Sequence, residues 1–234
     1  IFETIDEPVD IQDSEGAYAL PPIKGEVEFK DVVFEYEPGH PILNHMSFRV
    51  KPGENIALVG PTGAGKTTVI NLISRFYDIS SGQVLIDGHE VSKVTLNSLR
   101  SQMGVMLQDS FIFSGNILEN IRYGKLDATM DEVISAARTV KADEFIQQME
   151  DGYKTEVNER GSRLSQGQKQ LVSFARTLIA DPKILILDEA TSSIDTKTER
   201  LMQQGLNELM RGRTSFIIAH RLSTIQSCDR ILYI

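Results

Sequence analysis

The sequence predicts an α/β fold whose main sheet is mostly parallel, with an antiparallel β part before it and a helical part inserted into it. Residues 55–59, 183–187 and 215–219 are short apolar runs, which is typical of strands buried on both faces. Segments with helical periodicity separate these runs, and such alternation is typical of a parallel sheet with crossover helices. A chain of 234 residues with 41% hydrophobic side chains is large enough to bury the core of one such domain.

The N-terminal part predicts an arm followed by paired strands. Residues 1–24 are acidic, lack a sustained period and contain two prolines near their end, so we expect a linker or an extended arm before a domain at 25–234. The segments 26–36 and 42–50 are rich in β-branched and aromatic residues and flank the turn sequence EPGHP. This pattern predicts two antiparallel strands.

Apolar residues at a spacing of three and four predict the helices. Val69, Leu72 and Ile73 follow the first apolar run and a glycine-rich loop, which gives a strand, a loop and a helix in succession. From about 98 to 165 the pattern is mainly helical, so we expect an inserted helical subdomain there. A further helix is predicted through 199–210, between the last two apolar runs.

Composition and charge exclude several classes of protein. The net charge is −9, and residues 1–31 alone hold nine acidic and two basic residues. A phosphate-tracking surface needs clustered Lys and Arg, so nucleic acid is not an expected partner. The longest apolar runs, such as 184–187 and 216–219, are far shorter than the roughly 20 residues that span a bilayer. Cys228 is the only cysteine, so no internal disulfide is expected.

The glycine-rich loop GPTGAGKT at Gly60–Thr67 fits the pattern G-x4-G-K-[ST]. Its glycines let backbone N–H groups surround phosphates, Lys66 adds a cation near the outer phosphates, and Thr67 offers a hydroxyl to Mg²⁺. The plainer alternative is an ordinary turn. The apolar strand before the loop and the helix after it favour phosphate binding instead.

Charged and polar residues follow two other predicted strands. Asp188 ends one apolar run, and an acid at such a strand end holds Mg²⁺ in nucleotide hydrolases of this type. Glu189, the next residue, is suited to polarise a water for attack on the γ-phosphate, whereas the alternative is a pair of solvated acids. His220 follows the last apolar run and is either structural or a γ-phosphate contact, which we favour. Because ligands bind beyond the carboxyl ends of parallel strands, these groups should converge with the glycine-rich loop.

A second helix start also suits an anion. Ser165 and Gln168 form an S-x-x-Q capping box before an amphipathic helix, and the box alone is the plainer explanation. Gly167 in the first turn costs about 1 kcal/mol relative to alanine, so close approach of the backbone to a ligand is the better explanation for it. The helix dipole and Ser165 would then face an anion. One nucleotide cannot occupy both helix starts of a single chain.

Three motifs together resemble those of a known family. LSQGQ at 164–168 is similar to the family sequence LSGGQ, GPTGAGKT at 60–67 to the Walker A loop, and ILILDE at 184–189 to the Walker B strand. The chain, from residue 26 to its end, therefore resembles the nucleotide-binding domain of an ABC transporter of the exporter type with a fused transmembrane domain. The resemblance implies a P-loop NTPase core of the ABC ATPase fold, with ATP and Mg²⁺ as its ligands.

The resemblance also implies roles for individual residues. Tyr36 would stack on the adenine ring, and Gln108 would meet Mg²⁺ or the attacking water, although a packed aromatic and a solvated amide are the plainer alternatives. The family pairs two such domains head to tail, so Ser165 and Gly167 of one would close over ATP held by the other. The implied nucleotide-binding residues are Tyr36, Gly60, Pro61, Thr62, Gly63, Ala64, Gly65, Lys66, Thr67, Thr68, Ser165, Gly167 and Gln168; the catalytic residues are Glu189, His220 and Gln108; the metal ligands are Thr67, Gln108 and Asp188; Asp195 would connect the two sites of the dimer.

The same resemblance implies partners and a location. TEVNERG at 155–161 is similar to the TEVGERG stretch with which exporters contact the coupling helices of their membrane domain, and residues 110–121 should line the same contact. The first residues, IFETIDEP, resemble the end of a membrane domain, and the family's last short segment is expected beyond Ile234. We therefore expect this domain at the cytoplasmic face of the cell membrane, as part of an integral membrane transporter.

Three departures from the family pattern leave alternatives open. Gln166 replaces the first glycine of LSGGQ, Asn158 stands where TEVGERG has a glycine, and SSID replaces SALD. Asn158 tolerates left-handed backbone better than most residues. Homodimer and heterodimer both fit, as do lipid, peptide, drug and iron-related cargo. A non-transport ABC ATPase would need coiled-coil insertions or basic surfaces that are absent from the sequence, and Glu189 argues against a module without turnover.

Overall fold

The computed structural model describes residues 11–106, 111–188, 196–219 and 221–234. The chain divides into two compact units. The first unit comprises residues 1–52, 60–102 and 234, and the second comprises residues 53–59 and 103–233.

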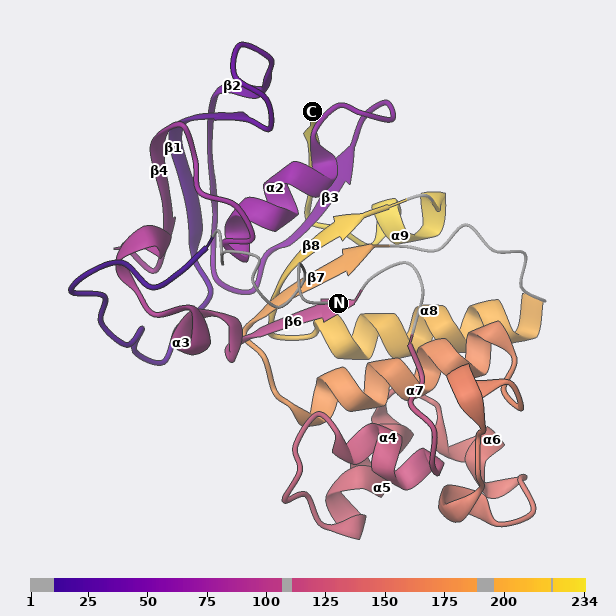
Figure 1. Ribbon diagram of the computed structural model, residues 1–234. Helices are drawn as coiled ribbons and strands as arrows, with labels where there is room; N and C mark the ends of the chain where they lie inside the picture. Colours follow the sequence, from indigo (N-terminus) through magenta and orange to yellow (C-terminus); the bar gives the residue numbers. More distant parts are fainter. Residues whose placement is uncertain (1–10, 107–110, 189–195, 220) are drawn as a thin grey trace. The chain divides into compact units, whose positions relative to one another are not determined.

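The first unit contains a four-stranded antiparallel sheet in the order β2-β1-β4-β5 (Figure 1). Val27 of β1 pairs with Val50 of β2 on one side and with Ile86 of β4 on the other, and all three side chains are buried. The antiparallel strands predicted for this part are confirmed. The elements of this unit are β1 (Val27–Glu35), β2 (Pro41–Val50), α2 (Lys66–Ile73), β4 (Ser81–Ile86), β5 (His89–Glu90), η1 (Val91–Lys93) and α3 (Leu96–Arg100).

The described part of the expected arm is extended and packs against this unit. Leu20 and Ile23 are buried. The backbone N–H of Leu20 donates to Ser98 Oγ at 2.8 Å, and that of Ile23 donates to Gln102 Oε1 at 2.9 Å. The Asp13 carboxylate accepts from the first backbone N–H of α3 at 2.7 Å, which satisfies one of the donors left unpaired at a helix start. Residues 11–24 are therefore fastened along their length.

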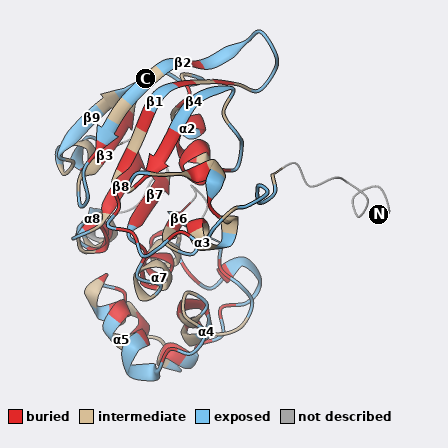
Figure 2. Ribbon diagram, turned by 90° about the vertical axis from the view of Figure 1, so that its left-hand side faces the viewer, coloured by how far each residue is buried: buried red, intermediate tan, exposed pale blue. Residues whose placement is uncertain are grey.

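The second unit is built on a five-stranded parallel sheet in the order β6-β7-β8-β3-β9. The three predicted apolar strands are confirmed as β3 (Asn55–Val59), β7 (Ile184–Asp188) and β8 (Thr214–Ile218), which are buried along most of their length (Figure 2). The remaining strands are β6 (Met103–Met106) and β9 (Arg230–Tyr233). β6 lies inside the interval that we expected to be mainly helical, because four residues around Gly104 carry too little strand pattern to be recognised.

In the second unit, α4, α5 and α6 lie within the interval 98–165 that was expected to be mainly helical, and α7 and α8 follow it (Figure 1). The longest of them in the described part of the chain, α7 and α8, pack against each other, and α7 also packs against α4 and α5. No helix among the described residues is long and apolar enough to cross a bilayer. The helices are α4 (Ile117–Arg122), α5 (Met130–Thr139), α6 (Asp143–Gln147), η2 (Gly152–Lys154), η3 (Glu159–Gly161), α7 (Gln166–Ile179), α8 (Thr196–Met210) and α9 (Leu222–Gln226).

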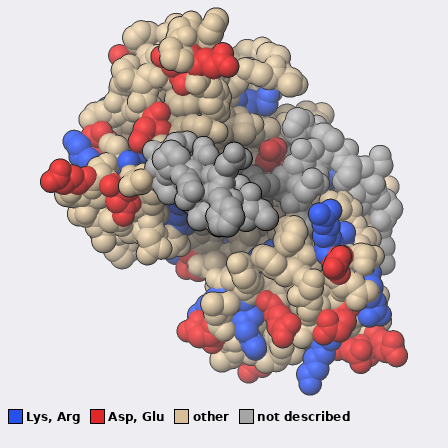
Figure 3. Space-filling model, viewed as in Figure 1, with Lys and Arg blue, Asp and Glu red and all other residues tan. Residues whose placement is uncertain are grey.

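The charged side chains of the helical region are of both signs. Figure 3 shows acidic and basic residues interspersed over the part formed by α4 to α6, so that neither sign dominates there on the face drawn. Many are paired: Lys125 Nζ lies 2.6 Å from a carboxylate oxygen of Glu132, and Arg138 Nε lies 3.0 Å from one of Asp143. Exposed pairs of this kind contribute little to stability, so the region is held by its apolar core.

Candidate nucleotide-binding site

The glycine-rich loop connects β3 to α2 through backbone that most residues avoid. Gly63 and Gly65 have φ angles of 84° and 102°, in the left-handed region. A Cβ at position 65 would lie 2.9 Å from Leu43 Cδ2, so this position requires both the freedom and the small size of glycine. The chain thereby turns sharply into α2.

The start of α2 is open to an anion. No side chain among the described residues caps this helix, and its first turn contains no acidic residue. The Lys66 ammonium donates to the carbonyl oxygens of Gly60 at 2.9 Å and Pro61 at 2.8 Å, which places a cation over the loop. Open backbone amides, the positive end of a helix dipole and a cation together fit a bound phosphate group.

Tyr36 lies in the same unit and is tied to α2. Its side chain is half exposed, and its hydroxyl is 3.2 Å from Thr68 Oγ1. Its ring meets Phe34 and Tyr77 edge to face, with centroids 4.7 and 5.0 Å apart. The residue predicted to contact adenine is therefore an exposed aromatic ring attached to the helix that follows the phosphate loop.

Asp188 is the last residue of β7, where it is half-buried. Asp188 pairs in register with Ile218 of β8, so β7 and β8 end at the same edge of the sheet. The Asp188 carboxylate therefore lies at the edge where β8 also ends, and its role as a Mg²⁺ ligand stays a prediction. Glu189, Gln108, His220 and Asp195 lie outside the described residues.

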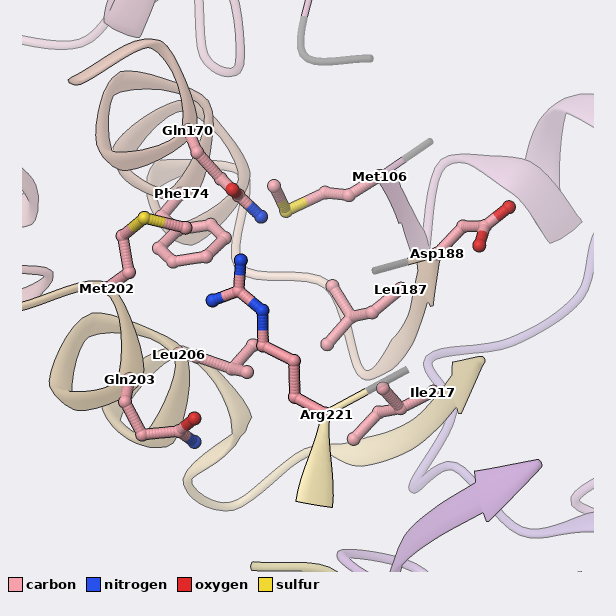
Figure 4. A pocket seen from close by; sticks show the side chains of 10 residues that line it. All are labelled: Met106, Gln170, Phe174, Leu187, Asp188, Met202, Gln203, Leu206, Ile217 and Arg221. Carbon is pink, nitrogen blue, oxygen red and sulfur yellow. The ribbon is translucent and has the colours of Figure 1, made fainter. Parts of the chain in front are cut away.

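A small cavity lined by both apolar and polar residues lies between α7, α8 and the ends of the strands (Figure 4). Its free volume is about 30 Å³, which is room for a water molecule and not for a nucleotide. The Arg221 side chain extends among the lining residues, while the Asp188 carboxylate points away from them (Figure 4). The lining residues are Met106, Gln170, Phe174, Leu187, Asp188, Met202, Gln203, Leu206, Ile217 and Arg221.

The start of α7 forms the predicted capping box. Ser165 Oγ accepts from the backbone N–H of Gln168 at 3.3 Å, and Gln168 Oε1 accepts from the backbone N–H of Ser165 at 2.8 Å. Ser165 is exposed. Gly167 is buried, and a Cβ there would lie 2.2 Å from Thr198 Cγ2 of α8. Packing of α7 on α8 therefore explains this glycine, an explanation that our sequence argument for a ligand did not include.

An exposed aromatic patch, formed by Phe111, Phe113 and Tyr123, is held by a buried network. Ring centroids of neighbouring members are 5.0 and 4.5 Å apart. The Arg176 guanidinium of α7 stacks on Phe113 and donates at 2.8 Å to Phe111 O, Asn120 O and Asn120 Oδ1. Burial lowers the pKa of Arg176 from its ordinary value. The sequence analysis missed Arg176 and Tyr123; an arginine at the edge of the apolar stripe of α7 was the available signal.

The TEVNERG segment adjoins the aromatic patch. The backbone N–H of Val157 donates to Gly115 O at 2.9 Å, and Asn116 forms an isolated bridge with Glu156. Asn158 has φ 58° and ψ −174°, so it occupies positive φ as expected, although at a ψ that is rare for any residue except glycine. The segment at 155–161 and the residues after 110 thus form one surface.

The fold and the loop define a P-loop nucleotide-binding domain, and comparison with known proteins identifies its family. The family model described as ABC transporter matches residues 43–192, and the chain belongs to this family. Its fold is the ABC ATPase fold, as predicted. It is an ATP-binding domain of that family.

Similar proteins include two bacterial relatives and one solved structure. The chain is 53% identical over 232 residues to the uncharacterized ABC transporter ATP-binding protein YknV of Bacillus subtilis, covering 99% of this chain and 38% of that protein. It is 50% identical to the fatty acid ABC transporter ATP-binding/permease protein of Mycobacterium tuberculosis, covering 100% of this chain and 37% of that protein. A bacterial Atm1-family ABC exporter with ATP bound matches the whole chain and 41% of its own, with a TM-score of 0.89 and 44% identity. The chain thus spans about two fifths of the length of these relatives.

Proposed function

We propose that this chain is the ATP-hydrolysing domain of an ABC exporter, which dimerises head to tail around two ATP molecules and powers export across a membrane. The observation that carries the proposal is the uncapped start of α2, with Lys66 over its loop. The whole of this chain matches a part of an ABC exporter with ATP bound.

The proposed roles follow from the chemistry of each group. The loop amides and Lys66 hold the phosphates, and Tyr36 stacks on the adenine ring. Glu189 orients the attacking water, and His220 contacts the γ-phosphate. These contacts position the nucleotide and the water for in-line attack.

The proposed donor set suits Mg²⁺. The Thr67 hydroxyl is exposed on the first turn of α2, and the Asp188 carboxylate ends β7. Together with Gln108 these are oxygen donors, which Mg²⁺ prefers, and nucleotide phosphates supply further ones. When bound, the ion would neutralise charge on the outer phosphates.

Two surfaces are proposed to meet partners. The exposed hydroxyl of Ser165, with Gly167 and Gln168, closes over the ATP of a second copy or a second ABC ATPase domain, and Asp195 links the two sites. The aromatic patch and the adjoining segment 155–161 receive the coupling helices of the membrane domain, which is part of the same polypeptide, at the cytoplasmic face. The name of one relative, ATP-binding/permease protein, supports such a fusion.

Phosphate release at increasing protein concentration tests this function. Turnover per chain should rise with concentration, because each proposed site needs a second copy. Glu189→Gln should retain ATP binding and lose about two to four orders of magnitude in turnover, the usual contribution of a general base. The exposed Glu150→Gln serves as a matched control and should hydrolyse normally. Turnover that is independent of concentration and unchanged in Glu189→Gln would refute the proposal.

A further inference from the structure

We propose that Tyr77 and Thr68 are positioning residues that hold the Tyr36 ring in place for a nucleotide base before the nucleotide arrives. The inference deepens the proposed function and rests on it. It concerns the base of the nucleotide and not its phosphates. It assigns an effect on ATP affinity to Tyr77, which no motif of the sequence singles out.

Three contacts fix the Tyr36 side chain. Its ring makes an angle of 88° with the ring of Phe34 and of 88° with that of Tyr77, at centroid distances of 4.7 and 5.0 Å. Its hydroxyl is 3.2 Å from Thr68 Oγ1. A tyrosine side chain has two main rotatable bonds, so contacts at the ring and at the hydroxyl restrict both.

Tyr77 is exposed in a way that core packing does not explain. It is 43% exposed and Tyr36 is 48% exposed, so both large rings keep much of their surface in water while contacting each other. Phe34, by contrast, is buried beneath them at 3% exposure and also contacts Tyr77, at 5.8 Å between centroids. The three rings thus form an aromatic cluster with a buried base and an open top.

The turn that carries Tyr77 is itself rigid. Arg100 donates to the carbonyl oxygens of Ser74 at 3.1 Å and Arg75 at 2.7 Å, and its guanidinium stacks over Phe76 at 4.8 Å from the centroid. The buried Arg75 side chain donates to Asp78 Oδ1 at 2.8 Å. The backbone that carries Tyr77 is therefore held by hydrogen bonds next to Tyr36.

The hydroxyl contact joins the ring to the phosphate loop. Thr68 is buried in the first turn of α2, directly after the proposed magnesium ligand Thr67. The Tyr36 ring is thereby tied to the helix whose start faces the phosphates. A ring that is already ordered loses less conformational entropy when a base stacks on it, so these contacts should increase affinity for ATP. Tyr77 would do so without touching the nucleotide.

The test compares two ligands by calorimetry on this chain with Mg²⁺ present. ATP carries a base, whereas inorganic tripolyphosphate presents a similar charge without one. Tyr77→Ala should weaken ATP binding by roughly 2- to 10-fold, the size of an aromatic pair contribution, and leave tripolyphosphate binding unchanged. Tyr77→Phe keeps the ring and should bind both ligands normally. Equal loss for both ligands would overturn the proposal, because it would indicate general disruption of the site.

Double-mutant cycles separate positioning from structural support. Tyr77→Ala should have no effect on ATP affinity in a Tyr36→Ala background, because no ring remains to be held. Tyr36→Phe and Thr68→Val each remove the hydroxyl contact, so Thr68→Val should weaken ATP binding less in a Tyr36→Phe background than in the original chain. Additive effects in both cycles would overturn the inference, and the second cycle decides if Tyr77→Ala does not fold.

A failure of the proposed function gives a different result. If the loop does not hold phosphates, Lys66→Ala will leave both ATP and tripolyphosphate affinity unchanged. If the function is right and the positioning inference is wrong, Lys66→Ala will weaken both ligands while Tyr77→Ala weakens neither or both.

Discussion

The starts of α2 and α7 both carry a motif that contains glycine, yet their backbone amides differ in whether a side chain of the same chain pairs with them. At α2 no described side chain caps the helix, and Gly65, at positive φ, has no side chain with which to cap it. At α7 the helix caps itself, because Ser165 and Gln168 satisfy each other's backbone donors. A helix dipole exists at both, so the dipole alone does not define an anion site. What distinguishes the two is whether the amides are already occupied.

The glycines at the two helix starts also have different roles. Gly65 serves the conformation of the loop, with φ at 102°. Gly167 has ordinary helical backbone and serves contact with Thr198 on the neighbouring helix. The first start therefore has the loop conformation and the unoccupied amides that suit a ligand, whereas the glycine of the second start is explained by packing between helices.

The largest expected effect is on phosphate affinity at α2. Lys66→Ala should weaken ATP binding by roughly 10- to 100-fold, because hydrogen bonds to charged groups contribute about 1.5–3 kcal/mol. Lys169→Ala removes a cation from the first turn of α7 and is the matched control, for which calorimetry should find nearly unchanged affinity in the monomeric chain. Equal losses of ATP affinity in the two variants would contradict the difference between the two helix starts.

The next effect is on stability, at the contact between α7 and α8. Gly167→Ala should destabilise the fold by about 1–2 kcal/mol in urea unfolding. A Cβ 2.2 Å from Thr198 Cγ2 places overpacking in the upper part of its range of about 1–3 kcal/mol, and alanine returns about 1 kcal/mol of helix propensity. Thr198 is β-branched and its methyl group has little freedom to move aside.

The compensating variant is Thr198→Ser, which removes that methyl group. The double variant Gly167→Ala with Thr198→Ser should recover most of the lost stability. A stable Gly167→Ala, or a double variant no better than the single one, would contradict the packing explanation and restore the ligand-based explanation of this glycine.

These examples indicate what the sequence could predict and what it could not. The parallel strands β3, β7 and β8, the antiparallel pair β1 and β2, and the phosphate loop all carry strong local patterns, so they were predictable. The capping box was also predictable, because it involves residues three apart.

What escaped prediction depends on contacts between distant segments. The room for a Cβ at Gly167 is limited by α8, which lies some thirty residues later in the chain. The hydrogen-bond partners of Arg176 lie near residues 111 and 120. The strand β6 has only four residues, so its place in the sheet comes from its pairing with β7. Local periodicity contains no information about such neighbours.

The smallest effect expected is that of the cap itself. Ser165→Ala should lower the free energy of unfolding by about 0.5–1 kcal/mol, the lower part of the range for N-caps, because the Ser165 Oγ to Gln168 N distance of 3.3 Å is long for a hydrogen bond. Ser162→Ala, at an exposed serine outside the capping box, is the control and should change little. A loss near 2 kcal/mol would contradict the weak cap that this distance indicates. The cap and the proposed contact with a second domain are compatible in either case, because the Ser165 oxygen accepts from the Gln168 N–H while its own proton can be donated to a phosphate oxygen.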